Sequence, residues 1–210
     1  LGMVDVALSE GVRIRCHMED VTRADIDGFV IPFVQKLMEK SEQVPGDLRV
    51  KIRLCDTLGL GISYPGAALP RSIPKLIYKM VHDCGVPHEC LEWHGHNDFH
   101  KVHINAATAW LYGCNALNTT LFGFGERTGN PPMEGAIIEY IGLKGNHNGI
   151  DTSVITEIAE YYTEQIGPEI PDFYPLVGKN FNVTRAGIHA DGLSKHEHIY
   201  NIFNTAKLLN

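Results

Sequence analysis

The stretch Glu92-Trp93-His94-Gly95-His96-Asn97-Asp98 ends a short apolar run and precedes a long helical pattern. Side chains of a β-strand alternate between its faces, so His94 and His96 are predicted to point to the same side, with Gly95 leaving room for a ligand. Two imidazoles on one side can share a cation such as zinc, manganese or iron. A bare His-x-His pair is also compatible with two ordinary strand-end histidines. The polar pair that follows favours the metal site, because α/β enzymes place their chemistry where a strand ends before a helix.

The same succession of strand and helix extends outward from this stretch and occurs four times. Apolar residues at helical spacing between Ile26 and Met38 predict a helix that packs against a sheet, with Thr22 as its N-terminal cap. Units spaced about 35 to 45 residues apart predict a parallel sheet with right-handed crossovers. Strands are expected at residues 12–18, 48–54, 90–93 and 116–122, and helices at 23–42, 74–84, 102–112 and 134–143.

Two architectures fit four such units. An open doubly wound sheet fits the 210 residues with nothing missing, whereas a (β/α)8 barrel takes about 250 residues and would be about half present. Every predicted strand ends in candidate chemistry, namely Glu19, Thr57, the histidine pair and Asn130. In an open sheet only the strands beside a switch point need such residues. The fold class is therefore predicted to be α/β, a TIM barrel of which residues 1–145 form one half.

Composition excludes several classes of function. Hydrophobic residues make up 44% and charged residues 20% of the chain, as in globular proteins. The net charge of -7 argues against a nucleic-acid or anionic-membrane partner. No apolar run approaches about 18 residues, so a membrane span has no support. The five cysteines form no C-x-x-C pair and are expected to be reduced structural thiols. With no signal peptide at the N-terminus, a cytoplasmic location is expected.

The composition changes after Gly145. A helical pattern covers residues 153–166, and three prolines, Pro168, Pro171 and Pro175, then indicate an extended linker. A segment rich in glycine, histidine and asparagine follows at residues 179–192. Residues 146–210 are therefore expected to form a linker and an arm. A tail of this kind cannot bury a core of its own and should pack on the barrel or on another subunit.

Three motifs, in this order, resemble those of the DRE-TIM metallolyases: residues 94–98 (His-Gly-His-Asn-Asp), the glycine-rich residues 123–130, and residues 187–192 (Gly-Ile-His-Ala-Asp-Gly). Within that superfamily the chain resembles the Claisen-condensing synthases, which make isopropylmalate, citramalate, homocitrate or citrate. Residues 15–20 and 96–101 are most similar to the Re-citrate synthases. The resemblance covers nearly the whole chain. It implies that the four strands are the fifth to eighth of the barrel, and that the first four, with the Asp-Arg-Glu motif, lie outside this sequence. Either the chain is a fragment or another chain completes the barrel.

The resemblance implies an acyltransferase that condenses acetyl-CoA with a 2-oxo acid. The methyl group of acetyl-CoA would lose a proton, the enolate would attack a metal-chelated 2-oxo acid, and the thioester would then be hydrolysed. The expected acceptor is oxaloacetate, with 2-oxoglutarate as the second choice. A divalent metal ion (Mn, Mg, Co or Zn) is the implied cofactor, and acetyl-CoA is the co-substrate.

By resemblance, the site residues have the following roles. His94, His96 and Asn130 would bind the metal, and Glu19 would take part in removing the proton. His17 and Thr57 would bind the oxo acid, while Gly123, Gly125 and Gly129 would let the backbone approach the thioester arm. His189 and Tyr200 would be catalytic residues on an arm that reaches the neighbouring subunit. A homodimer with exchanged arms is therefore expected.

Simpler roles remain open for several of these residues. Asn130 could be a turn residue before Pro131, and Glu19 could be a surface or capping residue. Asp98 is expected to orient a ligand histidine or to cap the next helix. Arg127 is expected to pair with the adjacent Glu126.

Three other functions also fit parts of the sequence. A retro-aldol lyase of the same superfamily, such as hydroxymethylglutaryl-CoA lyase, would lack the arm at residues 187–192. A metal-dependent amidohydrolase would have its His-x-His pair on the first strand, whereas here two strand-helix units precede it. The half-barrel could also be an inactive fragment or an interaction module.

Overall fold

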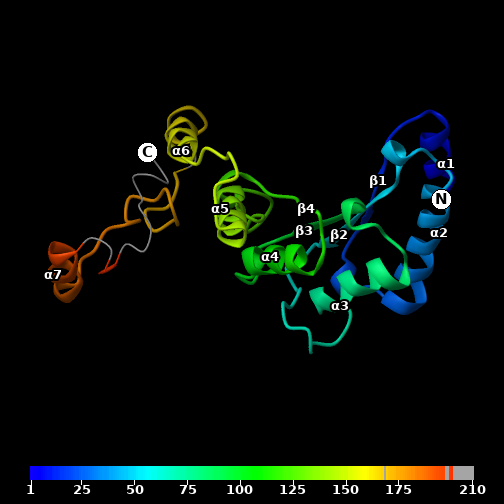
Figure 1. Ribbon diagram of the computed structural model, residues 1–210, viewed down its shortest axis with the longest axis horizontal. Coiled ribbons are helices and arrows are strands. Elements are labelled where there is room, and N and C mark those ends of the chain that lie inside the picture. Colours follow the sequence, from blue (N-terminus) through cyan, green and yellow to red (C-terminus); the bar gives the residue numbers. More distant parts are fainter. Residues whose placement is uncertain (168, 197–198, 201–210) are drawn as a thin grey trace. The chain divides into compact units, whose positions relative to one another are not determined.

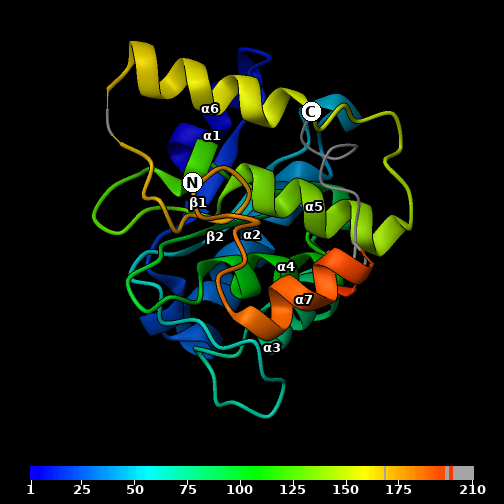
Figure 2. The ribbon, with the colours of Figure 1, turned by 90° about the vertical axis from the view of Figure 1, so that its left-hand side faces the viewer.

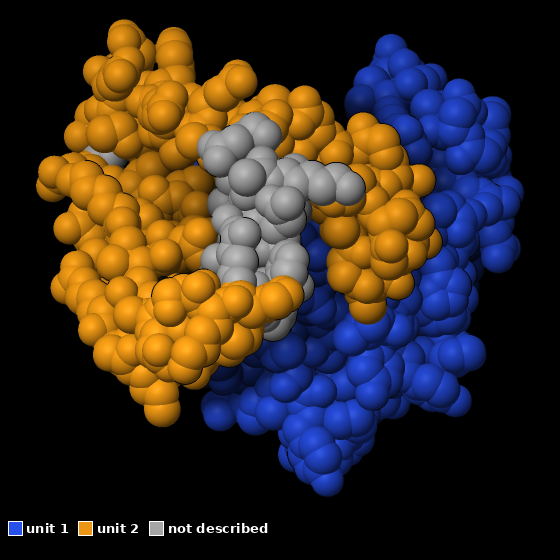
Figure 3. Space-filling view, turned by 60° about the vertical axis from the view of Figure 1, so that its left-hand side comes forward, with its two compact units in different colours: residues 1–139 blue, residues 140–210 orange. Residues whose placement is uncertain are grey.

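The computed structural model describes residues 1–167, 169–196 and 199–200. The chain divides into two compact units, Leu1–Glu139 and Tyr140–Asn210, which are coloured separately in Figure 3. The division falls inside helix α5 (Met133–Lys144), whereas the sequence analysis placed the boundary at residue 145. No helix in the described part of the chain is long and apolar enough to cross a membrane.

The first unit is built on a parallel sheet of four strands whose order, β1-β2-β3-β4, follows the chain (Figure 1). Such an order is typical of a barrel segment, since a doubly wound sheet reverses its direction at a switch point. The predicted α/β class with a parallel sheet is confirmed, and the chain forms part of a barrel. The strands are β1 (Arg15–Met18), β2 (Lys51–Asp56), β3 (Leu91–Gly95) and β4 (Ala116–Leu117).

The helices of this unit cover one face of the sheet. Ile52 and Leu54 of β2 and Trp93 of β3 are fully buried in one core cluster with apolar side chains of the helices. Helices α3 and α4 lie side by side (Figure 1, Figure 2). The α-helices of the unit are α1 (Gly2–Ser9), α2 (Ile31–Ser41), α3 (Ile73–Tyr78), α4 (Val102–Tyr112) and the start of α5. Single 3-10 or π turns occur at Val21–Arg23, Ile26–Val30, Gly46–Leu48, Lys79–Asp83, His88–Cys90 and Leu121–Gly123.

The alternate residues of the strands point to the opposite face. On β2, Lys51, Arg53 and Cys55 alternate with the buried Ile52 and Leu54. In the register of the sheet, His17 lies opposite Arg53, and Cys55 lies opposite His94. This second face, called the inner face below, therefore collects charged and polar side chains from neighbouring strands.

The expected capping role of Thr22 is wrong. Its buried hydroxyl donates a hydrogen bond to Asp56 Oδ1 at 2.8 Å, at the end of β2. The helical region begins instead after Asp25, whose carboxylate accepts a hydrogen bond from Gly28 N at 2.9 Å. The local sequence pattern predicted that the Thr22 hydroxyl would cap the helix, but it binds Asp56 of another strand instead.

The fourth strand is much shorter than the predicted residues 116–122. Asn118 N still donates to Trp93 O of β3, but Thr120 pairs with the chain after the glycine-rich loop: Thr120 N donates to Pro131 O, and Met133 N donates to Thr120 O. Phe122 then adopts a left-handed conformation with φ of 52°. Helix α1 was not predicted from the sequence.

The second unit contains helices α6 (Val154–Gln165) and α7 (Gly187–Lys195). Helix α6 agrees with the helical pattern at residues 153–166. Helix α7 lies in the arm, which was expected to be extended or helical, and overlaps the glycine-rich segment 179–192 at residues 187–192.

Candidate metal and substrate site

The two histidines lie where β3 ends, and their rings are nearly perpendicular, at 81°. His94 Nε2 and His96 Nε2 are 3.1 Å apart. Two nitrogens bound to one zinc ion at about 2.0 to 2.1 Å would lie roughly 3.0 to 3.4 Å apart, so this spacing fits a shared divalent cation. The predicted placement of both rings on one side of the strand is confirmed.

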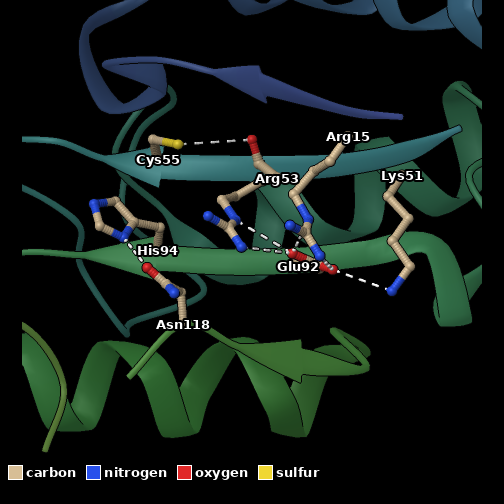
Figure 4. Close-up of polar contacts among 7 residues, drawn as sticks. All are labelled: Arg15, Lys51, Arg53, Cys55, Glu92, His94 and Asn118. Atoms are coloured by element: carbon tan, nitrogen blue, oxygen red, sulfur yellow. Dashed lines mark hydrogen bonds and ion pairs between the residues drawn. The ribbon is translucent and has the colours of Figure 1, made fainter. Parts of the chain in front are cut away.

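A third residue, Asn118, fixes the tautomer of His94. Its side-chain oxygen lies 2.6 Å from His94 Nδ1 (Figure 4). Because an amide oxygen only accepts, Nδ1 carries the proton and Nε2 keeps a lone pair for a metal. Burial lowers the pKa of His94, and this also favours the neutral imidazole that binds metals. Asn118 is a site residue that was not predicted from the sequence, although it is the first polar residue after β4.

Asn130 is buried beside the histidines. Its Nδ2 donates a hydrogen bond of 2.9 Å to the carbonyl oxygen of Gly95, the residue between the two histidines. A Cβ atom on Gly125 would lie 2.0 Å from Asn130 Oδ1. Gly129 has a φ of 98°, and its Cβ would lie 2.0 Å from Gly123 O. The glycines at 125 and 129 are therefore required by the packing of the loop itself, whatever the loop binds.

Arg127 ties this glycine-rich loop to two strand ends. Its Nε donates to Asp98 Oδ2 at 2.9 Å, and its Nη2 donates to the carbonyl oxygen of Thr57 at 2.5 Å. The expected roles of Asp98 in orienting a histidine or capping a helix are therefore wrong, because its carboxylate binds Arg127. The hydrogen bond from Arg127 also keeps the pKa of Asp98 below its ordinary value. The expected pair with Glu126 exists, but its contact is longer, at 3.4 Å.

Glu19 follows β1 and is held by Thr57. The Thr57 hydroxyl donates a hydrogen bond of 2.5 Å to Glu19 Oε1 and accepts one of 2.9 Å from the Asp20 backbone N–H. His17 and Cys55 lie next to Glu19 on the inner face. The sequence analysis treated Cys55 as a structural cysteine. Its thiol is buried, and this burial, with the nearby negative charge of Glu19, raises the pKa of Cys55 to about 12.

Glu92 forms a charged cluster on the inner face, two residues before His94. Arg15 Nε lies 2.6 Å, Arg53 Nη2 3.0 Å and Lys51 Nζ 3.2 Å from its carboxylate oxygens (Figure 4). Burial alone would favour the neutral acid, but hydrogen bonds from the three cations outweigh it, and the pKa of Glu92 lies below its ordinary value. No role for Glu92 was predicted from the sequence.

His189 and Tyr200, the two predicted catalytic residues of the arm, belong to the second unit. His189 lies on α7, and the centroid of its ring is 4.3 Å from that of Tyr200. The structure thus brings these two side chains together within the second unit.

Comparisons with known proteins point to one family. The family model described as HMGL-like matches residues 2–161. Citrate (Re)-synthase of Syntrophus aciditrophicus is 62% identical over 209 residues, which are 100% of this chain and 33% of that protein. Citrate (Re)-synthase of Clostridium kluyveri is 52% identical over 209 residues, 100% of this chain and 46% of that protein. The chain therefore spans a third to a half of these relatives.

Solved structures show the same fold. Hydroxymethylglutaryl-CoA lyase from Pseudomonas aeruginosa matches with a TM-score of 0.55 and 22% identity, over 80% of this chain and 54% of that one. At this level of identity the likeness concerns the fold alone.

Proposed function

Because the chain belongs to the HMGL-like family, we propose that it forms part of the catalytic barrel of a synthase that condenses acetyl-CoA with oxaloacetate to give citrate. The observation that carries this proposal is the identity of 62% and 52% to two proteins named Citrate (Re)-synthase, over the full length of the chain. A second acceptor, 2-oxoglutarate, is kept because Homocitrate synthase 1 of a Nostoc species is 27% identical over 200 residues, which are 95% of this chain and 48% of that protein.

His94, His96 and Asn130 would hold the divalent metal of this reaction. The spacing of the two Nε2 atoms and the hydrogen bond from His94 to Asn118 support the two histidine ligands. Asn130 is included because it is buried beside them and binds the carbonyl oxygen of Gly95. When bound, the metal supplies Lewis-acid chemistry that makes the keto carbon of the oxo acid electrophilic. Asn118 is a positioning residue, because it acts on the metal site only through the His94 ring.

Glu19 is the proposed base that takes a proton from the acetyl-CoA methyl group. The hydrogen bond from the Thr57 hydroxyl to Oε1 orients its carboxylate at the end of the strands. His17 lies beside it on the same face and would contact the distal carboxylate of the oxo acid. Thr57 was expected to bind the substrate carboxylate, and the direction of its hydroxyl favours a role in orienting Glu19.

The glycine-rich loop would lie along the thioester arm of acetyl-CoA. Arg127 supports this role because it fixes the loop to the end of β2, where Thr57 holds the proposed base, and to the chain after the histidine pair on β3. His189 and Tyr200 would complete the site from the arm of a partner subunit in an arm-exchanged homodimer. Their close approach within the second unit supports a joint role in acid-base chemistry.

The test uses the complete gene product, acetyl-CoA and a panel of 2-oxo acids, with release of free CoA thiol as the signal. Oxaloacetate is expected to give the fastest release. His94→Ala should lower the rate at least about 100-fold, because it removes a metal ligand. His82→Ala is the matched control at an exposed position of the first unit. Absence of thiol release with every 2-oxo acid, from a folded protein supplied with metal, would refute the proposed function.

A further inference from the structure

A second group of metal-binding side chains lies on the inner face besides the histidine pair. His17, Glu19 and Cys55 each offer one ligand atom, and these atoms all lie within 4.8 Å of one another. Among the described residues it is the only group of three or more His, Cys, Asp or Glu side chains with this spacing. The sequence analysis connected none of the three with a metal.

The pairing of β1 with β2 explains why these residues meet. His17 lies opposite Arg53 and Met18 opposite Leu54, so the chain after β1 brings Glu19 next to Cys55. Alternation along β2 places Cys55 on the same face as Arg53, and therefore on the face of His17. The hydrogen bond from Thr57 then holds Glu19 over the end of the two strands.

The ligand atoms of this group are largely available. His17 and Glu19 are exposed, and within the described residues the His17 ring makes no hydrogen bond. Cys55 lies beneath them with 1% of its surface exposed, and its thiol contacts the carbonyl oxygen of Arg53 at 3.9 Å and forms a hydrogen bond with Glu19. A cation from solvent could thus reach the exposed His17 and Glu19, and the buried sulfur of Cys55 could bind it from below.

We propose that His17, Glu19 and Cys55 form a second cation site, specific for a thiophilic divalent ion such as Zn²⁺. One imidazole, one carboxylate and one thiolate make a three-ligand set with an open fourth position, and zinc accepts all three ligand types. On binding, the Cys55 thiol releases its proton to solvent and forms a bond from sulfur to the metal. The charges of thiolate and carboxylate then balance those of the ion. Mg²⁺ and Mn²⁺ prefer oxygen ligands and are not selected by sulfur.

Occupation of this site would inhibit the reaction, a consequence that rests on the proposed function. Glu19 is the proposed base and His17 a proposed acceptor-binding residue. A bound ion would coordinate both side chains, so neither could act on the substrates. A hard cation at the histidine pair is therefore expected to support activity, whereas Zn²⁺ at the second site is expected to suppress it. Only the second site contains a soft thiolate ligand, so a hard cation is expected to activate without occupying it, whereas Zn²⁺ is expected to inhibit.

Cobalt binding tests the site without any need for catalysis. The metal-free complete gene product is titrated with Co²⁺, and the thiolate-to-cobalt charge-transfer absorption is measured. The wild type should show this absorption, and Cys55→Ala should abolish it. Cys16→Ala is the control, because Cys16 is a second free thiol of the same sheet and lies on the opposite face of β1, against the core. His17→Gln changes an exposed side chain, should leave the fold intact, and should weaken the binding at least about tenfold.

The results separate this proposal from the proposed function. His94→Ala should keep the charge-transfer absorption, and its loss in that variant would overturn the assignment of a separate site. Full absorption in Cys55→Ala would also overturn it. An inactive protein with Cys55-dependent absorption would refute the proposed reaction alone. With Mg²⁺ in excess, the Zn²⁺ concentration that halves activity should be at least about tenfold higher for Cys55→Ala than for the wild type.

Discussion

Replacement of Glu92 by glutamine should destabilise the first unit strongly. The substitution keeps the shape of the side chain but removes the negative charge that binds Arg15, Lys51 and Arg53 in the charged cluster. The Glu92 side chain is 5% exposed, so water can compensate little at the carboxylate itself. The three cations would then face one another without a counterion.

The expected loss of unfolding free energy follows from these exposures. Removing one partner of a fully buried ion pair costs about 3 to 5 kcal/mol. Arg15, Lys51 and Arg53 are 40%, 19% and 15% exposed, so water partly solvates the cations that remain. We therefore expect a loss of about 2 to 3 kcal/mol for Glu92→Gln. Glu89→Gln is the matched control, because Glu89 is 66% exposed and makes one contact of 3.5 Å with Arg49.

Urea unfolding of the complete gene product, followed by tryptophan fluorescence, measures both variants. Trp93 is fully buried on the same strand as Glu92 and reports its unfolding. Glu89→Gln should change the unfolding free energy by less than about 0.5 kcal/mol. A value for Glu92→Gln within about 0.5 kcal/mol of the control would show that the cluster contributes no net stability.

The same cluster predicts a dependence on pH. The pKa of Glu92 is lowered in the folded protein, so its stabilisation is fully present above the ordinary carboxyl value of 4.5. It is lost as the pH falls below that value and through the folded pKa. The difference in stability between wild type and Glu92→Gln should therefore narrow below about pH 4.5. A constant difference down to about pH 3 would contradict this mechanism.

Three further predictions concern the site. Asn118→Ala should weaken Mn²⁺ binding about 10- to 100-fold in calorimetry, whereas Asn115→Ala, an exposed control, should not. Gly125→Ala should lower the melting temperature and soluble yield because of the clash in the loop, whereas Gly142→Ala, with open space in α5, should raise stability by about 0.5 to 1 kcal/mol. Arg127→Ala should make the glycine-rich loop more susceptible to limited proteolysis, and an unchanged cleavage rate would show that the loop holds its position without this side chain.

Much of the fold was predictable because its signals are local. The helix expected at residues 102–112 has these bounds in the structure, where Gly113 with a φ of 122° ends it. The shared side of the two histidines could also be predicted locally, because side chains alternate between the faces of a strand. The prediction of a barrel, by contrast, required the observation that all four strands end in polar residues, which is a property of the whole chain.

The remaining contacts were not predictable because each residue had several chemically equivalent partners. Thr22 could cap a helix or bind a carboxylate, and in the structure it binds Asp56, which is 34 positions later in the sequence. Asp98 could orient a histidine, but the guanidinium of Arg127, 29 positions later in the sequence, binds it instead. Such choices depend on distances between strands and loops, and a single sequence does not contain those distances.

Gly125 and Asn130 are expected to evolve as a pair. A side chain at position 125 would occupy the space of the Asn130 amide, so each residue sets the volume allowed to the other. A family member that gains a side chain at position 125 should therefore carry a smaller residue at position 130, and with it lose the hydrogen bond to Gly95. The close packing at Gly125 therefore limits which residues can replace Asn130 beside the histidine pair during evolution.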